Sequence, residues 1–408
     1  MSVPGIRQGG PDLAERLHGT PGAAAVVARH AAGAGDVASA AVPLARVVRG
    51  DLVESVHLGH LVVLAPDGSV RLALGDPQVT VLARSSLKPL QAVGMLRAGL
   101  DLDGPHLALA CASHDGTPEH LRVVRETLLG AGLDESALDN TPDLPLDAEA
   151  AFAWRTDGHG PEPVAQNCSG KHAAMLATCV AHADEPGWEP ERYREAEHPV
   201  QVACRAAVEE LTGEQAWHVT VDGCGAPLFS TTLTGLARAF ARIAVAPVTE
   251  PGTPLARVAL AMSQHPELVG GAARDVTRAM RAVPGLVAKD GADGVYAAAL
   301  PDGSAVAFKV ADGAGRPRPA VLAAALRVAG AAAVPGVDLA ALDALGDVPV
   351  LGHGEPVGAV VPAFDGAGTA SGDGGRSAAG DGGAGADGSA GGAGGGGSAD
   401  GSAGGVPA

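Results

Sequence analysis

The stretch PLARVVRGDLVESVHLGHLVVLAPDGSVRLAL (Pro43–Leu74) sets the fold class of this chain of 408 residues. It consists of short runs of apolar and β-branched residues, and its Pro66-Asp67-Gly68 is typical of a tight turn between antiparallel strands. A similar stretch, Gly294–Val310, contains the turn Pro301-Asp302-Gly303. Together they predict strands over Pro43–Arg49, Leu52–His57, His60–Leu64, Ser69–Leu74, Gly294–Leu300 and Ser304–Val310.

Helical patterns occupy most of the chain between these two stretches. Ser85 or Ser86 is a suitable N-cap for a helix that runs to about Arg97, and Thr117-Pro118-Glu119 begins another with proline at its first position. The apolar run Leu107–Ala110 predicts a buried strand. Further helices are predicted near 170–183, 198–212, 230–243, 253–264, 272–283 and 317–330. Strands toward both ends with helices between them favour an α+β fold, in which helices cover a mixed, largely antiparallel sheet.

The two ends of the chain differ in composition from the middle. After Phe364 there is no Leu, Ile, Met, Phe, Trp or Tyr. Such a segment cannot offset its ordering entropy by burying apolar surface, so residues 364–408 are predicted to be a disordered tail. Residues 1–41 are rich in Gly and Ala and are expected to be poorly ordered, which leaves residues 42–363 as the folded domain.

Charge and composition exclude several classes of function. The net charge of −18 disfavours sequence-independent binding to nucleic acid or to anionic lipid. No apolar run is long enough to span a membrane, and the N-terminus lacks the apolar stretch of a secretory signal. Five cysteines, an odd number, argue against a disulfide framework. We therefore expect a cytoplasmic protein without a nucleic-acid or membrane partner.

Lysine is scarce in this chain, with four lysines against twenty-four arginines. Three of the four lie in short polar motifs: Lys88 in RSSLKP, Lys171 in NCSGKHA and Lys289 in AKDGADGVY. Arginine stays charged when buried, whereas lysine can lose its proton and act as a base. The scarcity therefore directs attention to these amines.

Two motifs combine serine with a possible base. In Ser85-Ser86-Leu87-Lys88, residues three apart share a helical face, so the Lys88 amine is expected to reach the Ser85 hydroxyl and, when buried, to take its proton. The alternative is a solvated helix start with a surface lysine. Cys111-Ala112-Ser113-His114-Asp115-Gly116 either presents Ser113 and His114 as reactive groups or is a turn that satisfies its own backbone.

Two further motifs contain cysteine beside glycine. In Asn167–His172, Cys168 and Lys171 share a helical face, and a thiolate beside an ammonium group is reactive or binds metal; the alternative is a buried structural thiol. The phosphate-loop pattern is incomplete here, which argues against nucleotide binding. In Asp222–Pro227 the glycines on both sides of Cys224 predict a special turn that exposes its thiol, or a turn in which the cysteine is incidental.

The motifs together resemble the L-asparaginase II family of Rhizobium etli type. RSSLKP, CASHDG, NCSGKHA, DGCGAP and KDGADGVY, with the early ESVHLG, occur in the order seen in that family, over about residues 42–362. The resemblance implies a fold similar to glutaminases and serine β-lactamases. It also implies hydrolysis of L-asparagine to L-aspartate and ammonia by a homodimer.

The resemblance further implies roles for individual residues. Two Ser–Lys pairs would carry the catalysis, namely Ser85 with Lys88 and Ser113 with Lys289. A Zn²⁺ site that assists substrate binding would be built from Cys168, Lys171 and Cys224. The residues expected to line the amino-acid pocket are Arg84, His172 and Asp222.

Two other functions compete with this interpretation. A penicillin-recognising hydrolase also begins with S-x-x-K, but the later S-D-N and K-T-G are both missing from the sequence. A catalytically silent zinc-binding or regulatory protein would keep the cysteines. It would have no use for two serine–amine pairs, so the enzyme is favoured.

Overall fold

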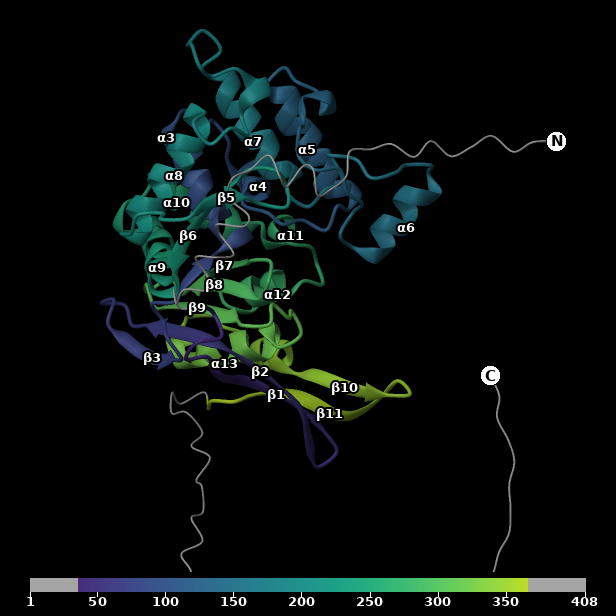
Figure 1. Ribbon diagram of the computed structural model, residues 1–408, viewed down its shortest axis with the longest axis vertical. Helices are drawn as coiled ribbons and strands as arrows, with labels where there is room; N and C mark the ends of the chain where they lie inside the picture. Colours follow the sequence, from purple (N-terminus) through teal and green to yellow (C-terminus); the bar gives the residue numbers. More distant parts are fainter. Residues whose placement is uncertain (1–35, 366–408) are drawn as a thin grey trace, which may run out of the picture. The chain divides into compact units, whose positions relative to one another are not determined.

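The computed structural model describes residues 36–365 (Figure 1). The predictions of a poorly ordered N-terminal segment and of a disordered tail fall almost entirely on residues 1–35 and 366–408, which lie outside the described residues. Within the described part, the first strand begins at Val42 and the last strand ends at Pro362.

The main sheet has eight strands in the order β10-β11-β1-β2-β9-β8-β7, with β3 paired to β2, and all of its pairings are antiparallel. Its strands β7, β8 and β9 consist mostly of Ala and Val and are buried along their whole length. Both of their faces are therefore covered. The strand bounds are β1 Val42–Arg49, β2 Leu52–Leu64, β3 Val70–Leu74, β7 Val287–Asp290, β8 Val295–Ala299, β9 Ala305–Val310, β10 Val348–Gly352 and β11 Glu355–Pro362.

Helices cover this sheet and form a second layer around a small sheet of β4 (Thr80–Leu82), β6 (Pro227–Thr232) and β5 (Val219–Val221). α9 packs against β2, β8 and β9, while α13 packs against β1, β2 and β9. The α+β class predicted from the sequence is therefore confirmed. The helix bounds are α3 Lys88–Arg97, α4 Gly104–Ala110, α5 Pro118–Gly130, α6 Ala148–Thr156, α7 Ser169–Val180, α8 Pro199–Thr212, α9 Leu233–Thr249, α10 Pro254–Gln264, α11 Pro266–Val269, α12 Asp275–Ala282, α13 Arg318–Ala329 and α14 Leu339–Gly346.

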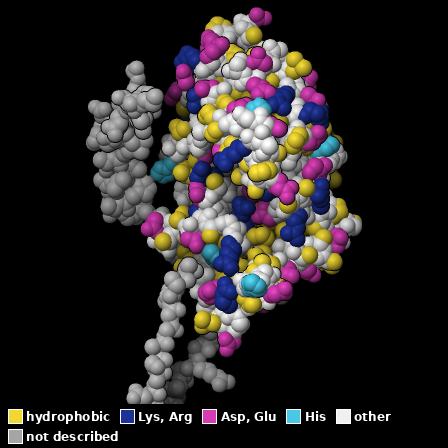
Figure 2. Space-filling model, turned by 90° about the vertical axis from the view of Figure 1, so that its right-hand side faces the viewer, with side chains coloured by type: hydrophobic (Ala, Val, Ile, Leu, Met, Phe, Trp, Pro, Cys, Tyr) yellow, Lys and Arg dark blue, Asp and Glu magenta, His cyan; other side chains and the backbone are white. Residues whose placement is uncertain are grey.

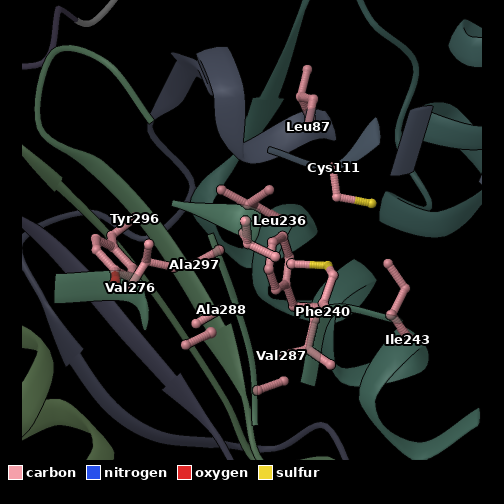
Figure 3. Packing of buried hydrophobic residues seen from close by; sticks show 14 of the residues in the cluster. Leu87, Cys111, Leu236, Phe240, Ile243, Val276, Val287, Ala288, Tyr296 and Ala297 are labelled. Atoms are coloured by element: carbon pink, nitrogen blue, oxygen red, sulfur yellow. The ribbon is translucent and has the colours of Figure 1, made fainter. Parts of the chain in front are cut away.

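The core extends from the main sheet through the surrounding helices, includes the layer between α9 and this sheet, and is built mainly from Ala, Val and Leu. Phe240 and Ile243 of α9 face Val287 of β7 in this layer (Figure 3). Cys111, which follows α4, is also buried in the core, with no exposed surface. The end of α4 is thereby fixed, and with it the start of the CASHDG segment that follows.

Three local predictions are wrong for identifiable reasons. The two strands predicted over Leu52–His57 and His60–Leu64 are one strand, β2. Gly59 lies inside it and allows close contact with the next strand, since an added Cβ would lie 2.1 Å from the carbonyl oxygen of Lys309. The apolar run Leu107–Ala110 belongs to helix α4, which begins with proline in its first turn. The helix predicted at 230–243 begins only at Leu233, because Pro227–Thr232 form a strand. The hairpin β10–β11 was not predicted.

The surface mixes charges of both signs. On the face shown in Figure 2, basic side chains are interspersed with acidic ones. Among residues 36–365, no helix combines the length and the apolar character needed to cross a bilayer.

Candidate active site

A cavity of about 300 Å³ gathers the motifs that the sequence singled out. Six of the predicted residues form part of its wall: Arg84, Ser85, Ser113, Cys168, Asp222 and Cys224. The other four are buried beside these wall residues: Lys88, Lys171, His172 and Lys289. Segments that are distant in sequence therefore meet at one site.

Lys88 is the buried amine in direct contact with a serine hydroxyl. A 3-10 helix, Arg84–Leu87, leads into α3, and Lys88 is the first residue of α3. Its Nζ lies 3.0 Å from Ser113 Oγ and 3.0 Å from Cys168 Sγ, and it also donates to the Ala112 carbonyl. The expected contact with Ser85 is not formed, because the amine lies against Ala112, Ser113 and Cys168 instead. Ser85 instead faces the cavity.

Backbone hydrogen bonds fix the CASHDG segment that carries Ser113. The Ser113 amide donates to the Val269 carbonyl at 3.0 Å, and the His114 amide donates to the Asn167 carbonyl at 3.0 Å. The His114 ring is fully buried, its Nε2 is 2.9 Å from Ser169 Oγ, and burial lowers its pKa well below the ordinary value. His114 therefore joins two segments as a neutral ring, while the Ser113 hydroxyl reaches the cavity.

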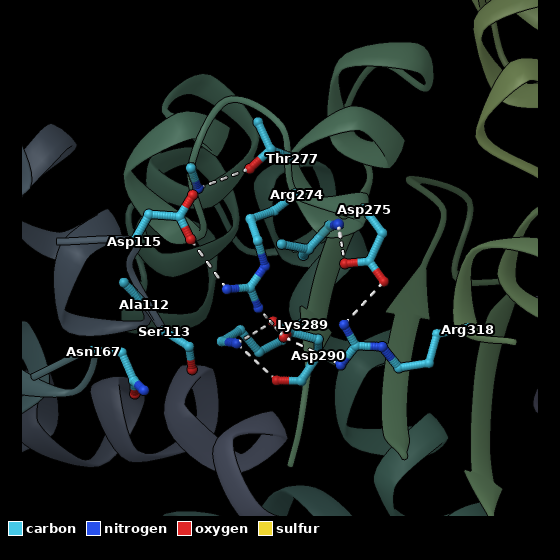
Figure 4. A network of polar contacts seen from close by, with 12 residues as sticks. Ala112, Ser113, Asp115, Asn167, Arg274, Asp275, Thr277, Lys289, Asp290 and Arg318 are labelled. Atoms are coloured by element: carbon cyan, nitrogen blue, oxygen red, sulfur yellow. Dashed lines mark hydrogen bonds and ion pairs between the residues drawn. The ribbon is translucent and has the colours of Figure 1, made fainter. Parts of the chain in front are cut away.

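Lys289 is the second buried amine, and its partner is a carboxylate (Figure 4). It lies on β7 with no exposed surface and donates to the carbonyl of Asp290 at 2.7 Å and to its Oδ1 at 2.6 Å. The pKa of Lys289 is lowered to about 8, because burial and the nearby Lys88 outweigh the attraction of Asp290. The predicted contact between Lys289 and Ser113 is not formed, since the amine turns toward Asp290.

Arg84 and Asp222 form an ion pair in the cavity wall. Arg84 Nε donates to Asp222 Oδ1 at 2.8 Å, and its Nη1 pairs with Asp293. Arg84 has a left-handed φ of 53°, a strained conformation for a residue with a side chain. Burial acts to raise the pKa of Asp222, but Lys171 and Arg84 lower it overall, so the carboxylate keeps its charge. The predicted turn is present, with Gly225 at φ 88°, but Cys224 is only 2% exposed and faces the cavity instead of the outer surface.

His172 lies deeper than predicted. It has no exposed surface, and its Nδ1 is 2.7 Å from the Tyr193 hydroxyl. Burial lowers its pKa well below the ordinary value. The ring does not line the cavity, and its Nε2 has no hydrogen-bond partner within the described chain.

Two thiols and an amine lie together at another part of the wall. Lys171 Nζ lies 3.3 Å from Cys224 Sγ, and Cys168 Sγ lies 3.0 Å from Asn167 Oδ1. The hydrogen bond from Cys168 and the charge of Lys171 lower the pKa of Cys224, whereas that hydrogen bond and burial raise the pKa of Cys168. Burial acts to lower the pKa of Lys171, but the two sulfurs raise it overall. Burial alone therefore does not neutralise this amine.

The distance between Lys171 and Cys224 is compatible with two of the three predicted ligands of a zinc ion. Two ligands of a tetrahedral zinc, one sulfur and one nitrogen, lie about 3.6 Å apart, and the Lys171–Cys224 separation of 3.3 Å is close to this value. In the part of the chain that the structure describes, no group of three His, Cys, Asp or Glu side chains is placed to hold a metal. A zinc site here therefore needs Lys171. All five cysteines are free, as expected.

Sequence reasoning missed several residues of the cavity. Asn167 lies in NCSGKHA and Asp290 in KDGADGVY, each beside a predicted site residue, so these motifs contained a signal for them. Arg274 and Arg318 also line the cavity, but they lie at the starts of α12 and α13 without a recognisable pattern.

A cavity that brings serine hydroxyls beside buried amines is typical of hydrolases. The sequence model of the L-asparaginase II family matches residues 45–362, so the chain belongs to this family of hydrolases. A search of curated proteins finds no match.

Among solved structures, the chain is similar to a β-lactamase from Mycobacterium bovis, with 16% identity, coverage of 71% of this chain and 95% of that chain, and a TM-score of 0.34. It is also similar to Mglu in its Tris and glutamate form, with 16% identity and a TM-score of 0.28. That match covers 66% of this chain and 58% of the Mglu chain.

Proposed function

We propose that this protein is an L-asparagine amidohydrolase, which releases L-aspartate and ammonia. Membership of the L-asparaginase II family supports the reaction class. The observation that carries the proposal is the 3.0 Å hydrogen bond between Lys88 Nζ and Ser113 Oγ at a cavity that Ser85 also lines. An amine held against a hydroxyl, with a second hydroxyl open to substrate, can perform acyl transfer.

In the proposed reaction Ser85 is the nucleophile. Side chains three apart in a 3-10 helix lie above one another, so a rotation of the Ser85 side chain brings its hydroxyl toward Lys88 and Ser113. A bond forms between Ser85 Oγ and the side-chain amide carbon of asparagine while the hydroxyl proton of Ser85 passes to Lys88, directly or through Ser113. The C–N bond then breaks, the nitrogen leaves with a proton as ammonia, and water hydrolyses the resulting ester. Lys289 supplies the second amine for these proton transfers.

The wall residues suit a small zwitterionic substrate. Arg84 and Asp222 neutralise one another in the absence of substrate. Their charges are opposite to those of the α-carboxylate and the α-ammonium group of asparagine, and arginine binds a carboxylate with two parallel hydrogen bonds. The cavity volume of about 300 Å³ is at the small end of ligand pockets.

The proposal includes a zinc ion held by Cys168, Cys224 and Lys171. When bound, the ion would offer an open coordination position that helps to hold the substrate. Lys88 contacts Cys168, so it would orient this ligand from the side of Ser113. From the family resemblance and the sequence, the proposal also includes a homodimer, a cytoplasmic location and no nucleic-acid or membrane partner. Light scattering of the purified protein tests the dimer.

Ammonia release tests the reaction. The purified chain is incubated with L-asparagine, L-glutamine and the β-lactam nitrocefin, each with and without a chelator. We expect ammonia from asparagine and no hydrolysis of nitrocefin. Folded protein that releases no ammonia under any condition would support the silent zinc-binding alternative instead.

The nucleophile is identified by mass spectrometry after acid quenching. We expect an aspartyl ester on Ser85 and loss of ester and activity in Ser85→Ala. The neighbouring Ser86 is buried and does not line the cavity, so Ser86→Ala is the matched control and should retain activity. An ester on Ser113 would reassign the attack.

A further inference from the structure

Beside the cavity lies a cluster of charged side chains, of which the proposed reaction uses only one (Figure 4). Each of them is at most 20% exposed. The cluster contains three cations and three anions: Lys289, Arg274 and Arg318 with Asp115, Asp275 and Asp290.

Asp290 is the centre of this cluster because three cations share its carboxylate. Its Oδ1 accepts from Lys289 Nζ at 2.6 Å, and its Oδ2 accepts from Arg274 Nη2 at 2.6 Å. Arg318 Nη1 lies 3.5 Å from the same Oδ2. The two guanidinium groups keep their charge, whereas the amine can lose its proton. The arginines therefore compete with Lys289 for one negative charge.

Contacts on their far sides hold both arginines in place. Arg274 Nη1 lies 3.2 Å from Asp115 Oδ1, and Arg318 Nη2 lies 3.3 Å from Asp275 Oδ2. Arg318 also lies over the ring of Tyr296, 5.9 Å from its centroid. The arginines are thus anchored independently of Lys289, and their charge stays beside Asp290 whether or not the lysine is protonated.

The surroundings of Lys289 contain few other charges. Lys88 approaches it from α3, Arg274 from the start of α12, and the Cys111 thiol from the end of α4. Burial raises the pKa of Cys111 to about 12, so this thiol is neutral. Asp290 is then the anion that favours a proton on Lys289, while Lys88 and Arg274 oppose it.

We propose that Arg274 and Arg318 are positioning residues for Lys289. Because the two arginines also pair with Asp290, this carboxylate fixes the position of the Lys289 amine but stabilises its protonated form less than an unshared carboxylate would. This division of one carboxylate is independent of the substrate, whereas its consequence for catalysis rests on the proposed function above.

The scarcity of lysine permits a direct test. Protein labelled with ¹³C at the lysine ε-carbons should give four signals, because the chain has four lysines, and Lys289→Met identifies one of them. Arg318→Met is expected to raise the titration midpoint of Lys289 by about one pH unit. Asp275→Asn removes an anion that Arg318 contacts and is expected to lower the midpoint.

Two controls separate this effect from general ones. Arg316→Met removes the same charge from an exposed position two residues away and should leave the midpoint unchanged. Arg318→Lys keeps the charge and should restore a midpoint close to that of the wild type. The signals of Lys88, Lys171 and Lys309 and the melting temperature report whether each variant is folded, and Arg318→Lys adds a fifth lysine signal.

Unchanged midpoints in both Arg318→Met and Asp275→Asn, or shifts of the same sign, would overturn the inference. If the midpoints shift as expected but the wild type releases no ammonia, the proposed function fails and the positioning role stands. If ammonia is released but the midpoints do not move, the inference alone fails.

Discussion

The rate of asparagine hydrolysis is expected to depend on pH through Lys289. The amine accepts a proton only when it is neutral, and its neutral fraction rises with pH. With a pKa of about 8, this fraction is about 9% at pH 7, about 50% at pH 8 and about 91% at pH 9. The value of kcat/KM should therefore rise about fivefold between pH 7 and 8 and less than twofold between pH 8 and 9.

A solvated lysine predicts a different curve. With a pKa of about 10.4 its neutral fraction rises about tenfold in each of these two intervals. The curvature between pH 7 and 9, rather than the rise itself, therefore reports the burial of Lys289. Because the pH dependence of kcat/KM reflects the pKa values of the free enzyme, the curvature describes Lys289 before substrate binds.

Ammonia release at low substrate concentration between pH 6 and 9 provides the measurement. The substrate's own ammonium group titrates near the upper end of this range, so each rate is corrected for the fraction of substrate that carries the ammonium group. Circular dichroism at each pH shows that the protein stays folded, and Lys289→Met should have little activity throughout. A rate that is flat from pH 6 to 9, or that still rises tenfold between pH 8 and 9, would refute the reasoning.

Three further changes test other parts of the site. Lys88→Met should lower kcat at least about 10²-fold, because general base catalysis contributes that much or more and the variant removes the amine that contacts the Ser113 hydroxyl. Steady-state ammonia release measures kcat, and an unchanged value contradicts the prediction. Lys171→Met should reduce bound zinc from about one ion per chain to almost none, measured by elemental analysis after dialysis, and retained zinc would remove the amine from the ligand set. Gly271→Ala would place a Cβ 1.8 Å from Asp115 Oδ2, so it should cost about 1–3 kcal/mol of stability in denaturant unfolding, and an unchanged midpoint would show that the carboxylate can move away.

The fold was predictable where local pattern and tertiary structure agree. The turn Pro66-Asp67-Gly68 and helix α8 (Pro199–Thr212) follow from turn and capping residues that act over a few positions. Strand β2 was predicted as two strands because the feature that requires Gly59, the backbone of Lys309, is distant in sequence. The run Leu107–Ala110 was too short for its period to distinguish strand from helix.

The site shows the same division between local and distant information. The hydroxyls and thiols named from the sequence line one cavity, and the three named lysines are buried beside it. It paired Lys88 with Ser85, its neighbour along the chain, whereas the amine contacts Ser113. The position of Ser113 is set by its hydrogen bond to Val269, far along the chain. No local sequence pattern predicts this contact. Arg318 could not be predicted either, because it is the first residue of α13 and lies outside the recognised motifs.

Arginine and lysine have different places at this cavity, and the difference has an electrostatic consequence. Arg84, Arg274 and Arg318 stand in the wall, each paired with a carboxylate, while Lys88 and Lys289 are buried. A fixed positive charge disfavours protonation of an amine nearby. The arginines near Lys289 therefore favour its neutral form, which is the form that would accept a proton in the proposed reaction. Lysine in place of Arg274 would add another titrating amine. The substitution would then change the pH dependence of kcat/KM more than the affinity of the cavity for substrate.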